Sequence, residues 1–191
     1  ELAEILEVLE KNNQSPVNDF KIDLNNDGTY SFNVTGAALD RFRADIFGKS
    51  SVDKLEYNKN FDFDEANATA EQIMTYLMDK DNFGVDASAY DQKIAYEIVV
   101  LRYAIKGNFY ARYKSTKIAQ DVSDEVVAYV NEHMDSLPGV SVDEDMIRKY
   151  NYSEYFSSII GYTGKISDSE YKKLFAEDDS YTENDVIGKA G

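Results

Sequence analysis

The sequence predicts an α+β fold in which mixed helices are combined with a β-hairpin and a small antiparallel or mixed sheet. Apolar residues recur at helical spacing in several stretches, beginning with residues 2–9. Two short alternating stretches flank the turn-forming residues 25–28, which is typical of a hairpin. Strand and helix patterns do not alternate regularly along the chain, and this favours α+β over a parallel α/β sheet.

Composition restricts the classes of protein and site that the chain can represent. Its 191 residues, 43% hydrophobic and 29% charged, suit one soluble domain with room for a satellite lobe. A net charge of −16 argues against binding to nucleic acid or to anionic membrane surfaces, since both require basic residues. The absence of cysteine excludes disulfides, thiolate nucleophiles and thiolate metal sites.

The N-terminal stretch predicts a helix, a hairpin and a second helix. Apolar residues alternate with polar ones in 20–24 and 30–34, and NNDG at 25–28 supplies the turn between two strands. A helix is expected around 36–47, whereas the polar stretch 50–68 shows little periodicity. The first helix is predicted from four apolar residues on one face: Leu2, Ile5, Leu6 and Leu9.

Capping residues predict where the next two helices begin. Thr69 and Gln72 form a capping-box pattern, and Ser88 and Asp91 repeat it ahead of a longer helix. Gly107 stands where the C-terminal glycine of that helix is expected. The inner face of the longer helix is predicted to comprise four residues: Ile94, Ile98, Leu101 and Ile105.

The following stretch predicts a strand and another helix. Aromatic and hydroxyl-bearing residues in 109–119 indicate the strand. Ser123, followed by Asp124 and Glu125, opens the helix. Its inward face is expected to comprise Val126, Val127 and Val130.

The C-terminal stretch predicts a turn, a short strand and two helices. Pro138 and Gly139 turn the chain into the strand at 139–142. A helix near 153–160 is expected to end at Gly161. A last helix, over 169–176, is capped by Ser167 and Glu170.

Two short patterns match the serine–lysine pair of penicillin-interacting acyltransferases, namely Ser51–Lys54 and Ser169–Lys172. Such chemistry needs the serine at the start of a buried helix, so that the lysine one turn on can take the hydroxyl proton. The partner patterns S-D-N and K-T-G do not occur. We therefore interpret both pairs as surface residues, with a hydrolase or acyltransferase as the enzyme alternative.

A calcium site and a histidine site are also unsupported by the sequence. Asp23, Asn25, Asp27 and Gly28 match the opening of an EF-hand loop, but its twelfth position needs a bidentate glutamate and is Val34. The only histidine, His133, lies near the end of a predicted helix, where it suits a partner of the helix dipole better than a metal ligand. Neither a metal site nor a cofactor is therefore expected.

Five motifs in series carry a resemblance to a known family. They are Ile118–Ser123 (IAQDVS), Leu137–Val140 (LPGV), Arg148 with Tyr150, residues 161–166 (GYTGKI) and residues 185–191 (DVIGKAG). In order and spacing they resemble the non-catalytic dimerisation, or pedestal, domain of class B penicillin-binding proteins. The likeness covers roughly residues 95–191.

The resemblance implies a domain organisation and a location. Residues 1–191 would form one pedestal domain, with a variable insert lobe at about 1–90 and a family-like core at about 91–191. Its parent would be a membrane-anchored peptidoglycan D,D-transpeptidase on the extracytoplasmic face of the bacterial membrane. We expect the chain to be a piece of that parent, with the membrane anchor and the catalytic domain outside it, and to have no enzymatic activity itself.

The resemblance also implies partners and structural residues. The expected partners are the C-terminal transpeptidase domain of the same chain and either a second copy or other cell-wall synthesis proteins, with no nucleic acid. Leu2, Ile5 and Leu9 offer a spare apolar face for such contacts, and Gly161 and Gly164 are expected to reverse the chain. The residues expected to shape the joint to the catalytic domain are Arg148, Tyr150, Gly161, Tyr162, Gly164, Asp185, Gly188, Lys189 and Gly191.

A binding module remains as the second alternative class. Fifteen tyrosines would suit a sugar-binding platform, although half-buried strand and groove positions explain them better. The alternative function is thus a free-standing extracellular module that binds glycan, protein or calcium.

Overall fold

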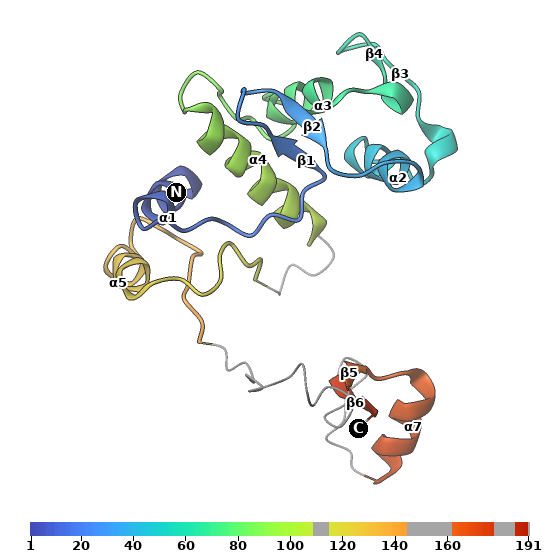
Figure 1. Ribbon diagram of the computed structural model, residues 1–191, viewed down its shortest axis with the longest axis vertical. Coiled ribbons are helices and arrows are strands. Elements are labelled where there is room, and N and C mark those ends of the chain that lie inside the picture. Colours follow the sequence, from blue (N-terminus) through green and yellow to red (C-terminus); the bar gives the residue numbers. More distant parts are fainter. Residues whose placement is uncertain (109–114, 145–161, 178–185, 191) are drawn as a thin grey trace. The chain divides into compact units, whose positions relative to one another are not determined.

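The computed structural model describes residues 1–108, 115–144, 162–177 and 186–190 (Figure 1). The chain divides into two compact units, residues 1–142 and 143–191. The described residues form six α-helices and three two-stranded antiparallel sheets. The predicted α+β class is therefore confirmed.

The described part of the first unit contains five α-helices, two 3-10 helices and two hairpins. The α-helices are α1 (Leu2–Lys11), α2 (Ala37–Ile46), α3 (Ala70–Met78), α4 (Gln92–Gly107) and α5 (Asp124–Glu132). The 3-10 helices are η1 (Val52–Lys54) and η2 (Glu65–Asn67). The hairpins pair β1 (Ile22–Leu24) with β2 (Tyr30–Phe32), and β3 (Tyr57–Asn58) with β4 (Phe63–Asp64).

Helix α4 is the centre of the core of the first unit. It packs against α1 and α3, while α1 also contacts α5 and β2 contacts α3 (Figure 1). Every residue of α4 from Ile94 to Leu101 is buried, so this half of the helix is surrounded on all sides. The largest fully buried side chains of the core are Leu6, Leu9, Ile22, Ile46, Ile73, Met74, Leu77, Val99, Leu101 and Leu137.

The apolar face of α1 is not spare. Ile5 is 4% exposed and Leu9 is 1% exposed, and both belong to the core of the first unit. Leu2 is partly buried and packs against that core. The expectation that these residues await a partner is therefore wrong, because α4 and α5 already cover the face.

The first hairpin is confirmed as a hairpin rather than a calcium loop. Leu24 pairs with Tyr30, and the side chain of Asp27 accepts hydrogen bonds from the backbone N–H and the hydroxyl group of Thr29, at 3.0 and 2.6 Å. Gly28 has a φ of +83°, which a glycine adopts without strain. The Asp27 carboxylate thus stabilises the turn of its own hairpin through hydrogen bonds.

The N-terminal cap of α3 is the one that the sequence predicted, whereas the cap of α4 differs from the prediction. The Thr69–Gln72 capping box of α3 is present and confirmed. Helix α4, however, is capped by Asp91, whose side chain accepts from the N–H of Ile94 at 2.9 Å, while Ser88 hydrogen-bonds Asp86 in the preceding turn. A single side chain therefore caps α4, and the predicted Ser88–Asp91 box does not form.

The C-terminal end of α4 also differs from the prediction. Gly107 is the last residue of the helix and Asn108 is its C-cap. Ile105 was expected on the inner face, but its side chain is 47% exposed. The buried stretch of α4 ends at Leu101, four residues earlier, so the last turn of the helix leaves the core.

Several predicted strands are not formed where the structure describes the chain. Residues 115–119 carry no strand, and 109–114 lie outside the described residues. Residues 139–142 carry no strand either, although Gly139 has the φ of +83° expected of a turn. The stretch 50–68, which lacked periodicity, forms η1, the β3–β4 hairpin and η2. The helix predicted near 153–160 lies outside the described residues.

The second unit combines one described helix with a two-stranded sheet. Its elements are β5 (Tyr162–Lys165), α7 (Asp168–Glu177) and β6 (Val186–Ala190). The strands run antiparallel, with Gly164 opposite Ile187 and a register shift between Tyr162 and Thr163. The predicted last helix is confirmed, and its cap is described below.

Candidate functional site

Neither serine–lysine pair has the setting of a nucleophile and its base. Lys54 is exposed, and its ammonium group donates to the hydroxyl of Ser50 at 2.8 Å rather than to Ser51. Ser169 and Lys172 are both exposed on α7. Neither lysine is buried beside the serine of its pair, as a lysine that takes the hydroxyl proton must be. The two pairs therefore lie at the surface, as the sequence predicted.

A hollow of about 290 Å³ lies at the surface of the first unit. Its lining includes Tyr90 and Arg102, together with residues from the start of α1. Neither Ser51 nor Lys54 contributes to it. The hollow does not therefore bring the candidate nucleophile to a binding site.

Four of the predicted joint residues lie together in the second unit. Tyr162 and Gly164 belong to β5, and Gly188 and Lys189 belong to β6. The remaining five lie outside the described residues: Arg148, Tyr150, Gly161, Asp185 and Gly191. Gly164 was expected in a turn but lies inside a strand, opposite Ile187.

The sheet of the second unit is tied to α7 by the carboxylate of Glu170. This carboxylate accepts hydrogen bonds from the backbone N–H of Ser167 at 2.8 Å and from its hydroxyl group at 2.6 Å. It also forms an ion pair and hydrogen bond with the ammonium group of Lys189 on β6. We call the three residues Ser167, Glu170 and Lys189 the Glu170 clamp.

The clamp perturbs the carboxyl group at its centre. The pKa of Glu170 is lowered to about 2, first by the hydrogen bond from Lys189 and then by the two hydrogen bonds from Ser167. Each of these donors stabilises the ionised carboxylate over the protonated acid. Glu170 therefore stays charged throughout the physiological pH range. The clamp thus has a structural role at these pH values and does not act as a proton donor or acceptor.

Gly164 makes room for the lysine of the clamp. A Cβ atom at position 164 would lie 3.3 Å from both Cγ and Cε of Lys189, closer than side chains ordinarily approach. The lysine stem thus crosses β5 where there is no side chain, and it is only 18% exposed. Gly188 has no such neighbour, since nothing lies within 4 Å of a Cβ placed there.

Among the described residues of the second unit, two aromatic side chains face solvent. Tyr162 on β5 is 67% exposed and Phe175 on α7 is 46% exposed. The ring of Phe175 lies 5.3 Å, between centroids, from that of Tyr171. Exposed aromatic rings of this kind are common in protein–protein contacts.

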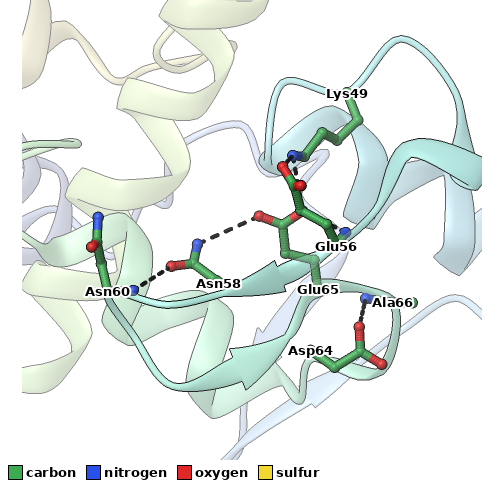
Figure 2. A network of polar contacts seen from close by, with 7 residues as sticks. All are labelled: Lys49, Glu56, Asn58, Asn60, Asp64, Glu65 and Ala66. Atoms are coloured by element: carbon green, nitrogen blue, oxygen red, sulfur yellow. Dashed lines mark hydrogen bonds and ion pairs between the residues drawn. The ribbon is translucent and has the colours of Figure 1, made fainter.

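A second polar network supports the β3–β4 hairpin in the first unit (Figure 2). The ammonium group of Lys49 lies 2.5 Å from the carboxylate of Glu56 and 3.3 Å from that of Glu65. Glu65 is 5% exposed, and it also accepts from the N–H of Glu56 at 3.2 Å and from the side chain of Asn58 at 3.4 Å. The buried carboxylate is thus surrounded by donors.

The network shifts the pKa values of Lys49 and Glu56 in opposite directions. The hydrogen bond to Glu56 raises the pKa of Lys49, and Glu65 raises it further, against the effect of burial. The same hydrogen bond lowers the pKa of Glu56. Sequence reasoning missed this network, because Lys49 and Glu65 are far apart in an acid-rich stretch with no periodic pattern.

The described residues contain neither a metal-binding cluster nor a membrane-spanning helix. They contain no cluster of three or more histidine, cysteine, aspartate or glutamate side chains arranged to hold a metal. His133 caps α5, with its Nδ1 atom 2.8 Å from the carbonyl oxygen of Tyr129 and its ring stacked on that of Tyr129. No described helix has the length and apolar character needed to cross a bilayer.

Comparisons with known proteins give a consistent result. A family model described as the penicillin-binding protein dimerisation domain matches residues 36–191. The peptidoglycan D,D-transpeptidase MrdA of Acinetobacter baumannii is 32% identical over 74 residues, which are 39% of this chain and 11% of that protein. Penicillin-binding protein 2A of Bacillus subtilis is 36% identical over 73 residues, 37% of this chain and 10% of that protein. The matched stretch therefore spans about a tenth of the length of either relative.

Proposed function

Since the chain belongs to the penicillin-binding protein dimerisation domain family, we propose that it is the non-catalytic pedestal of a class B penicillin-binding protein. The parent would be a peptidoglycan D,D-transpeptidase, the activity named for one of its relatives. In the parent, this chain would hold the transpeptidase domain in position and offer surface to other proteins of cell-wall synthesis.

The observation that carries this proposal is the family match over residues 36–191. It covers most of the first unit and the whole of the second. The surface setting of Ser51–Lys54 and Ser169–Lys172 supports the non-catalytic role, because a penicillin-reactive serine needs a buried lysine beside it. Within the pedestal we propose a variable lobe at about 1–90 and a family-like core at about 91–191.

The joint to the transpeptidase domain is proposed to lie in the second unit. Tyr162, Gly164, Gly188 and Lys189 gather there in the β5–β6 sheet, and the other proposed joint residues are Arg148, Tyr150, Gly161, Asp185 and Gly191. None of them has a reactive role in this proposal. Their task is to set the path of the chain where one domain meets the next.

The proposed location is the extracytoplasmic face of a bacterial membrane, with an anchor supplied by another part of the parent. The proposed partners are the transpeptidase domain, a second copy of the chain or other cell-wall synthesis proteins. The net charge of −16 favours basic surfaces on such partners over polyanions. The exposed Tyr162 and Phe175 are suited to the apolar part of such a contact.

A labelling experiment with fluorescent penicillin tests the proposal. The chain of residues 1–191 is incubated with the reagent beside the full-length parent, and covalent label is measured after denaturation. We expect stoichiometric label on the parent and none on the chain. Stoichiometric label on the chain, abolished by Ser51→Ala or Ser169→Ala, would show that it is itself an acyltransferase and would overturn the proposal.

A second arm tests the positioning role. A parent lacking residues 1–191, with its anchor joined directly to the transpeptidase domain, is expected to keep its reaction with penicillin but to lose cross-linking of peptidoglycan strands. Full cross-linking by the shortened protein would contradict a pedestal role.

A further inference from the structure

Among the residues that the structure describes in the second unit, strand β6 is held by its partner strand and by the Glu170 clamp. The β5–β6 sheet has only two strands among the described residues, and its register is interrupted between Tyr162 and Thr163. A two-stranded sheet is marginally stable on its own in water. Whatever else anchors β6 therefore has a large influence on how firmly the strand is placed.

The anchor that the structure shows is the carboxylate of Glu170. It binds Ser167 at the beginning of α7 through two hydrogen bonds, which fixes the carboxylate against the helix. It binds Lys189 on β6 through a charge-assisted hydrogen bond, a stronger kind than that between neutral groups. One side chain thus joins the helix to the strand.

Gly164 leaves space for the Lys189 side chain to reach Glu170. Because position 164 has no side chain, the stem of Lys189 crosses β5 in close contact and leads the ammonium group to Glu170. Only 18% of the lysine side chain is exposed, so its four-carbon stem is packed rather than free in solvent. Three elements, β5, β6 and α7, therefore meet at a single ion pair.

We propose that Glu170 is a positioning residue for the parent enzyme, acting through Lys189 to fix β6 and with it the direction in which the chain passes to the transpeptidase domain. This inference rests on the proposed function, because it takes β6 to be the start of that joint. Glu170 was expected from the sequence only as a helix cap. The structure adds its contact with a strand 19 residues further along the chain.

The alternative is that the clamp merely stabilises the second unit. Both roles predict some loss of stability when the ion pair is removed. Only the positioning role predicts that cross-linking, which requires the active site to meet two peptidoglycan strands, falls while the reaction of the active site with a small β-lactam is unchanged. The comparison of these two activities separates the roles.

The experiment uses the full-length parent and three variants. Lys189→Met removes the charge but keeps a stem of similar length over Gly164, Lys189→Arg keeps the charge, and Lys172→Met is the matched control. Lys172 is exposed on α7 and makes no ion pair with another described residue. Each protein is assayed for hydrogen exchange of the peptide containing residues 186–190, for penicillin acylation and for cross-linking.

We expect Lys189→Met to speed amide exchange in 186–190 by roughly tenfold and to lower cross-linking severalfold, with penicillin acylation unchanged. Lys189→Arg should restore both properties, and Lys172→Met should alter neither. Unchanged cross-linking in Lys189→Met would overturn the inference, whether or not exchange is faster. An equal loss of cross-linking and acylation would overturn it as well, since that pattern indicates general destabilisation.

Failure of the inference is distinguishable from failure of the proposed function. If the chain of residues 1–191 is itself acylated by penicillin, the proposed function is wrong and the inference falls with it. If the chain is not acylated but Lys189→Met cross-links normally, the pedestal role stands and only the positioning role of Glu170 is overturned.

Discussion

The hydroxyl group of Tyr96, on α4, donates a hydrogen bond of 2.8 Å to the carbonyl oxygen of Ile22, on β1. The same hydroxyl accepts from the side chain of Asn18 at 2.9 Å. Tyr96 is 6% exposed and Ile22 is fully buried, so this contact joins the central helix to the first hairpin inside the core. The hairpin is thereby placed by a polar contact as well as by apolar packing.

Replacing Tyr96 with phenylalanine is expected to destabilise the first unit by about 1–3 kcal/mol, because it leaves the buried carbonyl of Ile22 without a donor. The aromatic packing of the ring is retained, so the loss reports the hydrogen bonds. Urea unfolding followed by tyrosine fluorescence or circular dichroism measures it. Tyr90→Phe, at a position 40% exposed, is the control. Equal stability of the two variants would contradict the prediction.

Replacing Glu97 with glutamine is expected to stabilise the chain at neutral pH. Glu97 is 9% exposed on α4, and burial raises its pKa, while Lys93, which lowers it, is engaged by Glu10 at 2.6 Å. A raised pKa means that the folded state holds its proton more tightly than the unfolded state. Stability therefore falls as pH rises above the usual value of about 4.5.

The measurement is the difference in unfolding free energy between Glu97→Gln and the natural chain at several pH values. The variant should be the more stable at pH 7, and the difference should disappear below about pH 4.5, where both states are protonated. Glu7→Gln, an exposed change on α1 with the same effect on net charge, controls for the overall acidity. A constant difference across this range would be the contrary result.

Truncating Leu9 to alanine is expected to cost about 2–5 kcal/mol of stability, since the side chain is 1% exposed and its removal leaves a cavity. Val52→Ala, at a position 42% exposed, should change stability by less than about 0.5 kcal/mol. Thermal or urea unfolding distinguishes them. Small effects at both positions would mean that the face of α1 is free after all.

Removing the cap of α3 should have a smaller and more local effect. Thr69→Ala deletes the acceptor of the Gln72 N–H and is expected to cost about 1 kcal/mol, whereas Thr69→Ser keeps the hydroxyl group. The two variants differ in their caps while changing an exposed position, so core packing is unaffected. If serine destabilises as much as alanine, the cap is not the source of the loss.

The elements that the sequence predicted correctly are those defined by local rules. Each depends on residues within a few positions of one another: the apolar face of α1, the hairpin turn at Gly28 and the capping box at Thr69. Ser88 fits the same capping-box pattern as Thr69, but its backbone N–H and hydroxyl group both donate to the side chain of Asp86. Asp91 alone therefore caps α4. Local competition between acceptors decided the outcome.

The candidate site was harder to predict because its contacts are distant in sequence. The motifs containing Gly164 and Lys189 indicated the family, and the family is confirmed, but they did not indicate that the glycine accommodates the lysine. The pairing of Glu170 with Lys189, and that of Lys49 with Glu65, depends on how strands and helices pack. No spacing rule could have selected these partners among 36 acidic residues.

The acid titration of Glu170 tests the geometry of the clamp directly. Its pKa of about 2 lies below the ordinary 4.5, so the folded state holds this proton less tightly than the unfolded state. The clamp's stabilisation of the second unit is thus fully present above about pH 4.5 and is lost as pH falls towards about 2.

Carbon-detected NMR of the Glu170 side chain measures the midpoint of this titration. In the natural chain it should lie near 2, and in Lys189→Met it should rise, since the hydrogen bond from Lys189 is the largest cause of the lowering. Ser167→Ala should raise it less, because the backbone N–H of residue 167 still donates. A midpoint near 4.5 in the natural chain would mean that Lys189 does not reach Glu170 in solution, and β6 would then lack the anchor on which its placement depends.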